Sequence, residues 1–259
     1  MDGRVSPDTC SMSSRDFYQT SAGDHLVEAA YYPAQVVSFL EAESLFVAQL
    51  LDKCSLLIEV GSMWGRYLEF ALQLKKSYIG VDVVPRYIRI LQRRVEKIDI
   101  AGRIHMGYVC NVPQQEALYN LARPFCVEHR VLLVFPFNSI GNMLRLRNVA
   151  RQLASLARCG ASLCISTYRT SQYASAARRR YYENCSYRNV VSRKLRRGTL
   201  FRSAEGLRSM AYTADYIVRT FRGVGVEMKV MPLARIGAAY YFEPPSRYDT
   251  ESATPTLAS

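Results

Sequence analysis

The sequence predicts an α/β fold in which buried strands alternate with helices. Residues 56–58, Leu-Leu-Ile, form an apolar run that is too short for a helix and aliphatic enough for a buried strand. A glycine-containing turn and a helical pattern follow, and a second apolar run at 78–81 ends at Asp82. Strand, glycine turn, helix, strand and terminal acid together predict a nucleotide-binding βαβ unit.

The segment between the two strands has the period of an amphipathic helix. Its apolar residues stand at spacings of i, i+3, i+4 and i+7, at Tyr67, Phe70, Ala71 and Leu74. Two lysines and a serine at 75–77 close the segment, and cations at that end are favoured by the helix dipole. This crossover helix makes the two strands parallel neighbours.

An acid stands at the end of each predicted strand. Glu59 ends the first strand, and Asp82 ends the second, 23 positions later. The carboxyl ends of parallel strands meet at one edge of the sheet, where an acid accepts hydrogen bonds from both hydroxyls of a ribose. Asp82 as an ordinary surface residue is the alternative. Because acids stand at both strand ends, we favour the interpretation in which Asp82 binds a ligand.

The turn does not carry the dinucleotide fingerprint G-x-G-x-x-G. Met63 and Arg66 occupy the second and third glycine positions of that pattern, which argues against a nicotinamide enzyme. Glu59-x-Gly61-x-x-x-Gly65 instead resembles the first motif of class I S-adenosylmethionine-dependent methyltransferases. The stretch 81–85, Val-Asp-Val-Val-Pro, resembles their second motif. One departure is that Met63 stands where the family has its middle glycine.

This resemblance implies a fold and a cofactor. The fold is a Rossmann-like, seven-stranded, mostly parallel sheet with helices on both faces, an N-terminal helical lid and an insertion between strands five and six. The cofactor is S-adenosylmethionine. Asn111 follows the third strand, where the family often has an aspartate for the adenine amine. The cofactor-binding residues it implies are Glu59, Gly61, Ser62, Met63, Gly65, Asp82, Val83, Asn111 and Phe135.

Methyl transfer from a sulfonium is a direct displacement, so the implied reaction requires no metal site and no catalytic triad. The loop after the strand 131–135 lies beside the cofactor's methyl group in the resembling family. The catalytic candidates are His25, Tyr18, Tyr168 and Asn138, and the candidates for substrate binding are Tyr31, Tyr32, Asn138, Asn142 and Tyr212. Aromatic packing remains an alternative for Tyr31 and Tyr32, as does a capped turn for the two asparagines.

The chain divides into five predicted segments. They are a disordered start (1–15), a helical lid (16–55), a methyltransferase core (56–243) containing a basic insertion or cap (169–208), and a disordered tail (244–259). The last two strands, at 225–231 and 238–242, alternate as an antiparallel hairpin at the sheet edge.

Composition predicts a folded, cytoplasmic protein. Of 259 residues, 49% are hydrophobic and 22% charged, and no apolar run approaches the length of a membrane span. The first residues lack the hydrophobic core of a signal peptide. Seven cysteines without a C-x-x-C pair indicate reduced thiols, and only three histidines argue against a histidine-based metal site.

Positive charge is concentrated in one segment. The chain carries a formal +12, and residues 169–208 contain eleven Arg or Lys against two acids. Such a segment is consistent with RNA as the methyl acceptor, but a charge run is more often a solvated surface, and the sequence shows no appended RNA-binding module. We therefore favour a small molecule such as an amine, amino acid or specialised metabolite over RNA. A non-methylating relative that binds S-adenosylmethionine is the third possibility.

Overall fold

The larger of two sheets has seven strands, and in it every neighbouring pair is parallel except those that include β10. The computed structural model describes residues 14–96, 104–108, 117–143 and 145–245. In spatial order the strands are β3 (Ile104–Tyr108), β2 (Ser77–Asp82), β1 (Leu56–Val60), β4 (Val131–Phe135), β5 (Ser162–Tyr168), β10 (Gly237–Phe242) and β9 (Lys229–Leu233). The predicted Rossmann-like, mostly parallel sheet is confirmed, and β9 and β10 form the predicted antiparallel hairpin. The predicted disordered start and tail lie almost entirely outside the described residues, and Asn111 lies outside them too.

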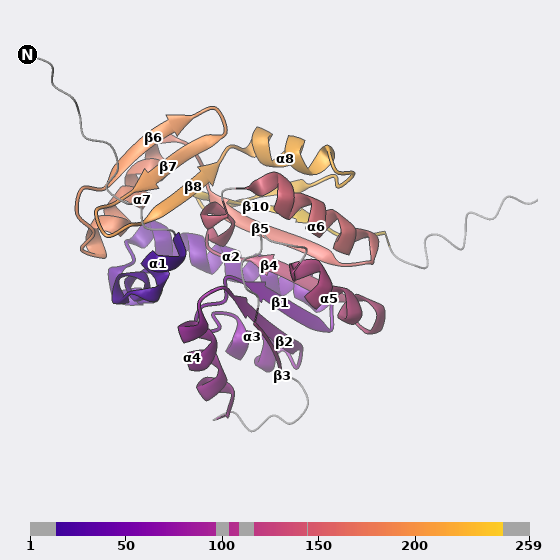
Figure 1. Cartoon of the computed structure of the whole chain (residues 1–259). Helices are drawn as coiled ribbons and strands as arrows, with labels where there is room; N and C mark the ends of the chain where they lie inside the picture. Colours follow the sequence, from indigo (N-terminus) through magenta and orange to yellow (C-terminus); the bar gives the residue numbers. More distant parts are fainter. Residues whose placement is uncertain (1–13, 97–103, 109–116, 144, 246–259) are drawn as a thin grey trace, which may run out of the picture.

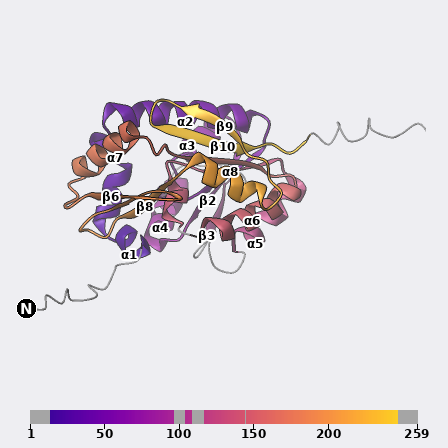
Figure 2. The same ribbon diagram turned by 90° about the horizontal axis from the view of Figure 1, so that it is seen from above.

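Helices cover both faces of this sheet, as Figure 2 shows edge-on. One face carries α2 (Ala34–Asp52), α3 (Leu68–Gln73) and α4 (Pro85–Glu96), and the other carries α5 (Ala117–Glu128), α6 (Leu146–Arg158) and α8 (Ala214–Arg222). Side chains of a strand alternate between faces, so Val134 packs with α2 whereas Phe135 packs with α6. Burial on both faces explains the continuous apolar runs of β1 and β4.

The helix α2 is long and apolar enough, by length and composition, to cross a membrane. The apolar run of α2 is interrupted by two glutamates at 41 and 43 and by polar residues, so the sequence pattern predicted no membrane span there. One side of α2 packs on the sheet, with Val36, Phe39 and Val47 buried in the core. This packing accounts for the apolar composition, and the cytoplasmic location stays a prediction.

The N-terminal segment forms short helices, α1 (Ser14–Gln19), η1 (Ser21–Val27) and η2 (Ala29–Tyr31). Two polar contacts fasten it to the sheet domain. Arg86 at the start of α4 forms an ion pair with Asp24 at 2.6 Å, and Asn142 Nδ2 donates to the Tyr18 hydroxyl at 2.8 Å. The segment therefore lies over the edge of the sheet where β2 and β4 end.

Residues 172–212 form a cap between β5 and α8. It consists of α7 (Gln172–Asn184) and a three-stranded antiparallel sheet of β6 (Val191–Leu195), β7 (Gly198–Arg202) and β8 (Arg208–Tyr212). This second sheet was not predicted, and it extends past the predicted boundary at 208. The cap lies beside α1 at one end of the molecule (Figure 1), and the Tyr181 hydroxyl donates to the Leu26 carbonyl at 2.6 Å. The N-terminal segment 14–31, called the lid below, and the cap thus form one continuous cover.

Candidate functional site

A cavity lies at the carboxyl ends of β1, β2 and β4, under the lid and the cap. The centre of a water molecule can occupy about 200 Å³ of it. One water needs only about 10–15 Å³ of such space, so the cavity has the dimensions of a ligand site. Its lining is Tyr18, Leu26, Val27, Glu59, Gly61, Ser62, Met63, Arg66, Asp82, Val83, Val84, Tyr87, Pro136, Phe137, Asn138, Ser139, Asn142, Met143, Tyr168, Tyr181, Tyr182 and Ser209.

The turn after β1 brings its backbone close to the loop after β4. Gly61 has φ +78°, and a Cβ there would lie 2.8 Å from Ser139 Cβ, so only glycine fits without displacing that loop. Met63 also has a positive φ, 46°, and its N–H donates to Asp82 Oδ2 at 2.9 Å. Met63 therefore adopts a left-handed conformation of the kind glycine favours, although it is not glycine.

Gly65 of the same motif lies outside the cavity. Its φ is +81°, and a Cβ there would lie 2.6 Å from Leu91 Cδ1 of α4. The glycine lets the turn pack closely on α4. Gly65, which the sequence predicts to contact the cofactor, is not among the residues that line this cavity.

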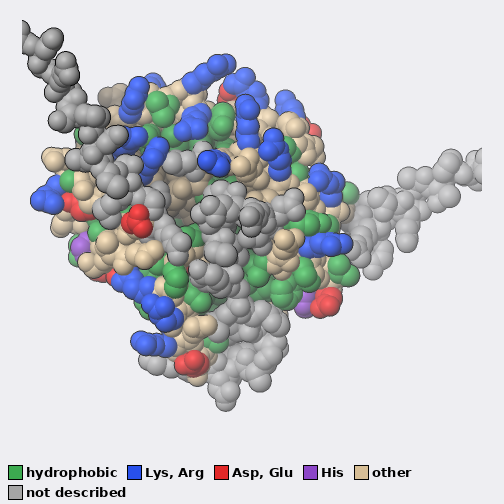
Figure 3. Space-filling view, in the orientation of Figure 1, with side chains coloured by type: hydrophobic (Ala, Val, Ile, Leu, Met, Phe, Trp, Pro, Cys, Tyr) green, Lys and Arg blue, Asp and Glu red, His purple; other side chains and the backbone are tan. Residues whose placement is uncertain are grey.

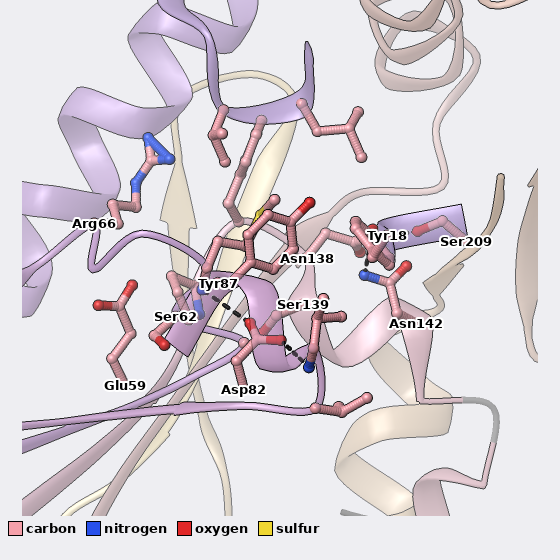
Figure 4. Close-up of a pocket in the computed structure, with 18 of the residues that line it drawn as sticks. Tyr18, Glu59, Ser62, Arg66, Asp82, Tyr87, Asn138, Ser139, Asn142 and Ser209 are labelled. Atoms are coloured by element: carbon pink, nitrogen blue, oxygen red, sulfur yellow. Dashed lines mark hydrogen bonds between the residues drawn. The ribbon is translucent and has the colours of Figure 1, made fainter. Parts of the chain in front are cut away.

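Asp82, at the end of β2, is hydrogen-bonded to the turn that follows β1. It is 6% exposed, and its two carboxylate oxygens accept from the Met63 and Val84 N–H groups, each at 2.9 Å. Burial raises the pKa of Asp82 to about 6, and the backbone donors act in the opposite direction. The Val83 N–H lowers the pKa in the same way, and Figure 4 shows the Asp82 carboxylate among the residues that line the cavity.

Glu59 is fully buried at the end of β1, with one carboxylate oxygen satisfied and the other free. Oε2 accepts from the Tyr67 N–H at 3.1 Å and the Tyr78 hydroxyl at 2.7 Å. Oε1 has no hydrogen-bond partner among the described residues. Burial raises the pKa of Glu59 from an ordinary value of 4.5 to about 7, against the effect of its two donors.

Further polar atoms around the cavity are buried without a partner in the described part of the chain. They are Ser62 Oγ, Ser139 Oγ, Asn142 Oδ1 and the Tyr168 hydroxyl. Native proteins leave few buried polar groups unsatisfied. Together with Glu59 Oε1, this group indicates a polar ligand in the cavity.

Glu43 and Arg66 support the cavity from the side of α2, and sequence reasoning missed both. Glu43 is 1% exposed, and Oε1 accepts from the Phe137 N–H at 2.7 Å and also from the Ser166 hydroxyl. Its Oε2 accepts from the Tyr67 hydroxyl at 3.0 Å and lies 3.9 Å from Arg66 Nε. The signal for Glu43 was present in the sequence as an acid on the apolar face of a helix.

Asn138 lines the cavity, but both ends of its amide are engaged by the protein. Oδ1 accepts from the Thr167 hydroxyl, and Nδ2 donates to Ser209 Oγ in the cap at 3.1 Å. Its φ of 63° follows a φ of 44° at Phe137, so the chain turns sharply after Pro136. Asn138 therefore connects the loop after β4 to β5 and to the cap.

Gly141 provides a test of how closely this loop packs on the cap. A Cβ there would lie 2.1 Å from the Met210 carbonyl oxygen and 2.3 Å from Asn138 Nδ2. Overpacking of this kind costs about 1–3 kcal/mol, so we expect Gly141→Ala to lower the free energy of unfolding by that amount in a urea titration. Gly223→Ala is the control, because a Cβ there meets nothing closer than 3.3 Å. Equal effects of the two substitutions would contradict the close packing.

Four tyrosines line the side of the cavity away from the β1 turn. They come from α1, β5 and α7, and are Tyr18, Tyr168, Tyr181 and Tyr182. Burial raises the pKa values of Tyr18, Tyr168 and Tyr181 well above the ordinary value of 10. These hydroxyls are therefore neutral hydrogen-bonding groups near neutral pH.

Several predicted site residues lie outside the cavity. His25 Nδ1 lies 3.0 Å from the Cys185 carbonyl oxygen, and its ring packs on Tyr31. Tyr32 donates to the Leu26 carbonyl at 3.2 Å and packs behind Phe137. Tyr212 donates to the Met143 carbonyl at 2.9 Å, and it packs in the core on the face of the sheet that carries α6 and α8. Phe135 is excluded from the lining because it faces α6.

The structure gathers the other predicted residues in one place. The cofactor candidates that line the cavity are Glu59, Gly61, Ser62, Met63, Asp82 and Val83, and the catalytic or substrate candidates are Tyr18, Asn138, Asn142 and Tyr168. Lining residues that sequence reasoning did not find include Leu26, Val27, Tyr87, Phe137, Tyr181, Tyr182 and Ser209. Of these, Tyr87 and Phe137 are close in sequence to a predicted motif. The lid and cap residues carry no local signal.

No protein-family model matches the sequence, and no curated protein matches it. Solved structures do match. The PH0226 protein of Pyrococcus horikoshii OT3 has 10% identity and a TM-score of 0.60, with 86% of this chain and 98% of that one covered. Magnesium protoporphyrin IX methyltransferase of Synechocystis PCC 6803, solved with S-adenosylhomocysteine, has 10% identity and a TM-score of 0.54 over 89% and 97% of the two chains.

A third match is the 1,6-didemethyltoxoflavin-N1-methyltransferase of Burkholderia thailandensis, solved with 1,6-didemethyltoxoflavin and S-adenosylhomocysteine. It has 11% identity and a TM-score of 0.52 over 95% of this chain and 98% of that one. At such identities the likeness establishes the fold. The strand order, the acids ending β1 and β2 and these matches agree: the chain has the fold of the class I S-adenosylmethionine-dependent methyltransferases.

Proposed function

We propose that this protein is an enzyme that transfers a methyl group from S-adenosylmethionine to a small molecule. The observation that carries the proposal is that one cavity joins two walls of different chemistry. Glu59, Ser62 and Asp82 form a polar wall at the strand ends, and tyrosines of the lid, β5 and the cap form an aromatic wall. Figure 4 shows Glu59 and Arg66 at one side of the cavity, with Tyr18, Asn142 and Ser209 at the other.

The polar wall fits the cofactor. Asp82 would accept hydrogen bonds from the ribose hydroxyls, and Val83 would lie beside the adenine. The free Oε1 of Glu59 would accept from the α-ammonium group, and the Arg66 guanidinium would pair with the carboxylate. The support for this assignment is the buried Glu59 oxygen without a partner and the close backbone approach at Gly61. When bound, S-adenosylmethionine supplies a methyl group on a sulfonium that is open to direct displacement.

The protein's own contribution to such a reaction is alignment and exclusion of water. Tyr18 and Tyr168 would act as neutral donors to the acceptor rather than as bases, since burial raises their pKa values. Asn142 keeps Oδ1 free while Nδ2 donates to Tyr18, so it would accept a hydrogen bond from the substrate. Asn138 would position the loop, because Thr167 and Ser209 occupy its amide.

The placement of positive charge supports a small molecule over RNA. Lys and Arg gather on the outer surface above the cap, α6 and α8 (Figure 3), and Arg193, Lys194, Arg196 and Arg202 are exposed. Among the described residues, Arg66 is the cation that lines the cavity. A nucleic-acid strand needs cations along its path to the reacting group, and this cavity has an aromatic wall there instead.

The test is to measure S-adenosylhomocysteine formation by the full chain with separate pools of amines, phenols, carboxylic acids and RNA transcripts. We expect turnover with a small-molecule pool. Methylation confined to RNA, with a steep dependence on salt, would replace the substrate assignment. Tight cofactor binding without product from any pool would identify a non-methylating relative.

The raised pKa values of Glu59 and Asp82 predict that stability and cofactor affinity change in opposite directions with pH. Glu59 has an ordinary pKa of 4.5 and a folded one of about 7, so between those values the folded protein holds more protons than the unfolded chain. Stability without ligand should therefore fall as pH rises from about 5 to 7. Asp82 adds to the fall between about 4 and 6.

Affinity for S-adenosylmethionine should instead rise over the same range, because its ammonium group favours the Glu59 carboxylate. The increase is expected to reach about tenfold per pH unit below 7. Thermal unfolding and calorimetric titration at pH 5, 6 and 7 measure both trends. Glu59→Gln should flatten them, whereas Glu41→Gln, an exposed acid on α2, should not. An affinity that does not change with pH would exclude Glu59 from ammonium binding.

A further inference from the structure

Arg178 of α7 is a buried cation that the proposed reaction does not yet use. It is 1% exposed, and its Nε donates to the Tyr182 hydroxyl at 2.8 Å. Neither of its terminal nitrogens has a hydrogen-bond partner in the described part of the chain. It takes part in none of the ion pairs formed between described residues.

Three aromatic rings surround the guanidinium. Its central carbon lies 4.9 Å from the ring centre of Tyr168, 5.4 Å from that of Tyr182 and 4.6 Å from that of Phe201. Cation–π attraction compensates part of the lost hydration. It leaves the terminal N–H groups unsatisfied, and a buried charge without a counter-ion is strongly unfavourable. A bound anion would supply both the missing acceptors and the counter-charge.

Arg178 does not itself line the cavity, but it packs directly against residues that do. Two of its three aromatic neighbours, Tyr168 and Tyr182, line that cavity. The Tyr168 hydroxyl is itself buried and has no partner among the residues that the structure describes, so it is a second available donor in the same region. Burial raises the pKa values of Tyr168 and Tyr18, and the positive charge of Arg178 acts in the opposite direction, so its field reaches two of the tyrosines that line the cavity.

We propose that Arg178 binds a carboxylate on the methyl acceptor, with the Tyr168 hydroxyl as an additional donor. The inference rests on the proposed methyltransferase function and specifies its substrate class as a carboxylic acid. The planar guanidinium offers two parallel N–H donors, which match the two oxygens of a carboxylate. The surrounding rings suit an aromatic or otherwise apolar body attached to that carboxylate.

The charge balance favours a carboxylate over a phosphate. One guanidinium neutralises one negative charge, whereas a phosphate dianion would leave an uncompensated charge in a dry site. Arg66, the cation of the described lining, lies beside Glu43 and over the Phe137 ring, at the Glu59 side of the cavity. The two arginines therefore serve different groups: Arg66 the cofactor and Arg178 the acceptor.

The test uses benzoate, benzamide and phenyl phosphate as probes, titrated calorimetrically into the full chain saturated with S-adenosylhomocysteine. We expect benzoate to bind at least tenfold more tightly than benzamide. Arg178→Met should reduce benzoate binding to the level of benzamide. Arg180→Met removes the same charge from an exposed position of α7 and should leave benzoate binding unchanged. Arg178→Lys keeps the charge but loses the paired donors, so it should show an intermediate affinity.

Three outcomes would overturn the proposal: equal binding of benzoate and benzamide, benzoate binding that survives Arg178→Met, or tighter binding of phenyl phosphate than of benzoate. The comparison of the probes needs no variant, so it decides the matter even if Arg178→Met does not fold. S-adenosylhomocysteine binding is measured separately for each variant. Its absence in the wild-type chain would contradict the proposed function, whereas its retention in Arg178→Met with loss of benzoate binding supports both proposals.

Discussion

Asp82→Ala is expected to weaken the binding of S-adenosylmethionine by about 10- to 150-fold. Hydrogen bonds to a charged group contribute about 1.5–3 kcal/mol, and the carboxylate of Asp82 is the acid at the end of β2 where a ribose would lie. Calorimetric titration measures the change directly. Because NAD also carries a ribose, the wild-type chain should be titrated with NAD as well, and we expect the adenosyl cofactor to bind more tightly.

The same substitution also removes the acceptor of the Met63 and Val84 N–H groups, so it needs two comparisons. Asp82→Asn keeps the shape and one acceptor oxygen, and we expect an intermediate affinity. Asp52→Ala removes an exposed carboxylate from the end of α2 and should leave the affinity unchanged. If Asp82→Ala folds and binds the cofactor as tightly as the wild-type chain, Asp82 does not contact the ribose.

Glu43→Ala is expected to lower the free energy of unfolding by about 3–5 kcal/mol, the range for breaking a buried charged pair. It would leave the Phe137 N–H and the hydroxyls of Ser166 and Tyr67 without their acceptor, and Arg66 without its nearest carboxylate. A urea titration followed by circular dichroism measures the loss. The loop after β4 would also lose its tie to α2, so cofactor affinity should fall with stability.

Glu43→Gln distinguishes the hydrogen bonds from the charge. Its amide oxygen can still accept from Phe137 and Ser166, and the Tyr67 hydroxyl can rotate to accept from the new NH₂ group. We therefore expect a loss smaller than that of Glu43→Ala. Glu41→Ala, at an exposed position two residues earlier, should change stability by less than about 0.5 kcal/mol. A Glu43→Ala loss as small as that of Glu41→Ala would show that the buried contacts contribute nothing net.

The proposed cofactor half of the site was predictable because its signals are local. Short apolar runs can be satisfied only by burial on both faces, and the acids at 59 and 82 end two such runs. Parallel pairing of β1 and β2 then places both acids at one edge of the sheet. Gly65 shows the limit of motif reading, since its positive φ serves the contact with Leu91 of α4 rather than a ligand.

The proposed acceptor half was decided by the tertiary structure alone. Sequence patterns predicted a basic segment after the fifth strand but treated its arginines alike, whereas packing turns Arg178 inward among three rings and leaves Arg193 and Arg196 in solvent. His25 and Tyr212 had the chemistry of site residues but pack elsewhere. Residues 56–82 determine by themselves the sheet edge at which we propose that the cofactor binds, because neighbours in sequence form that edge. The aromatic wall on the other side of the cavity depends on how lid and cap pack together. Those contacts join residues more than a hundred positions apart.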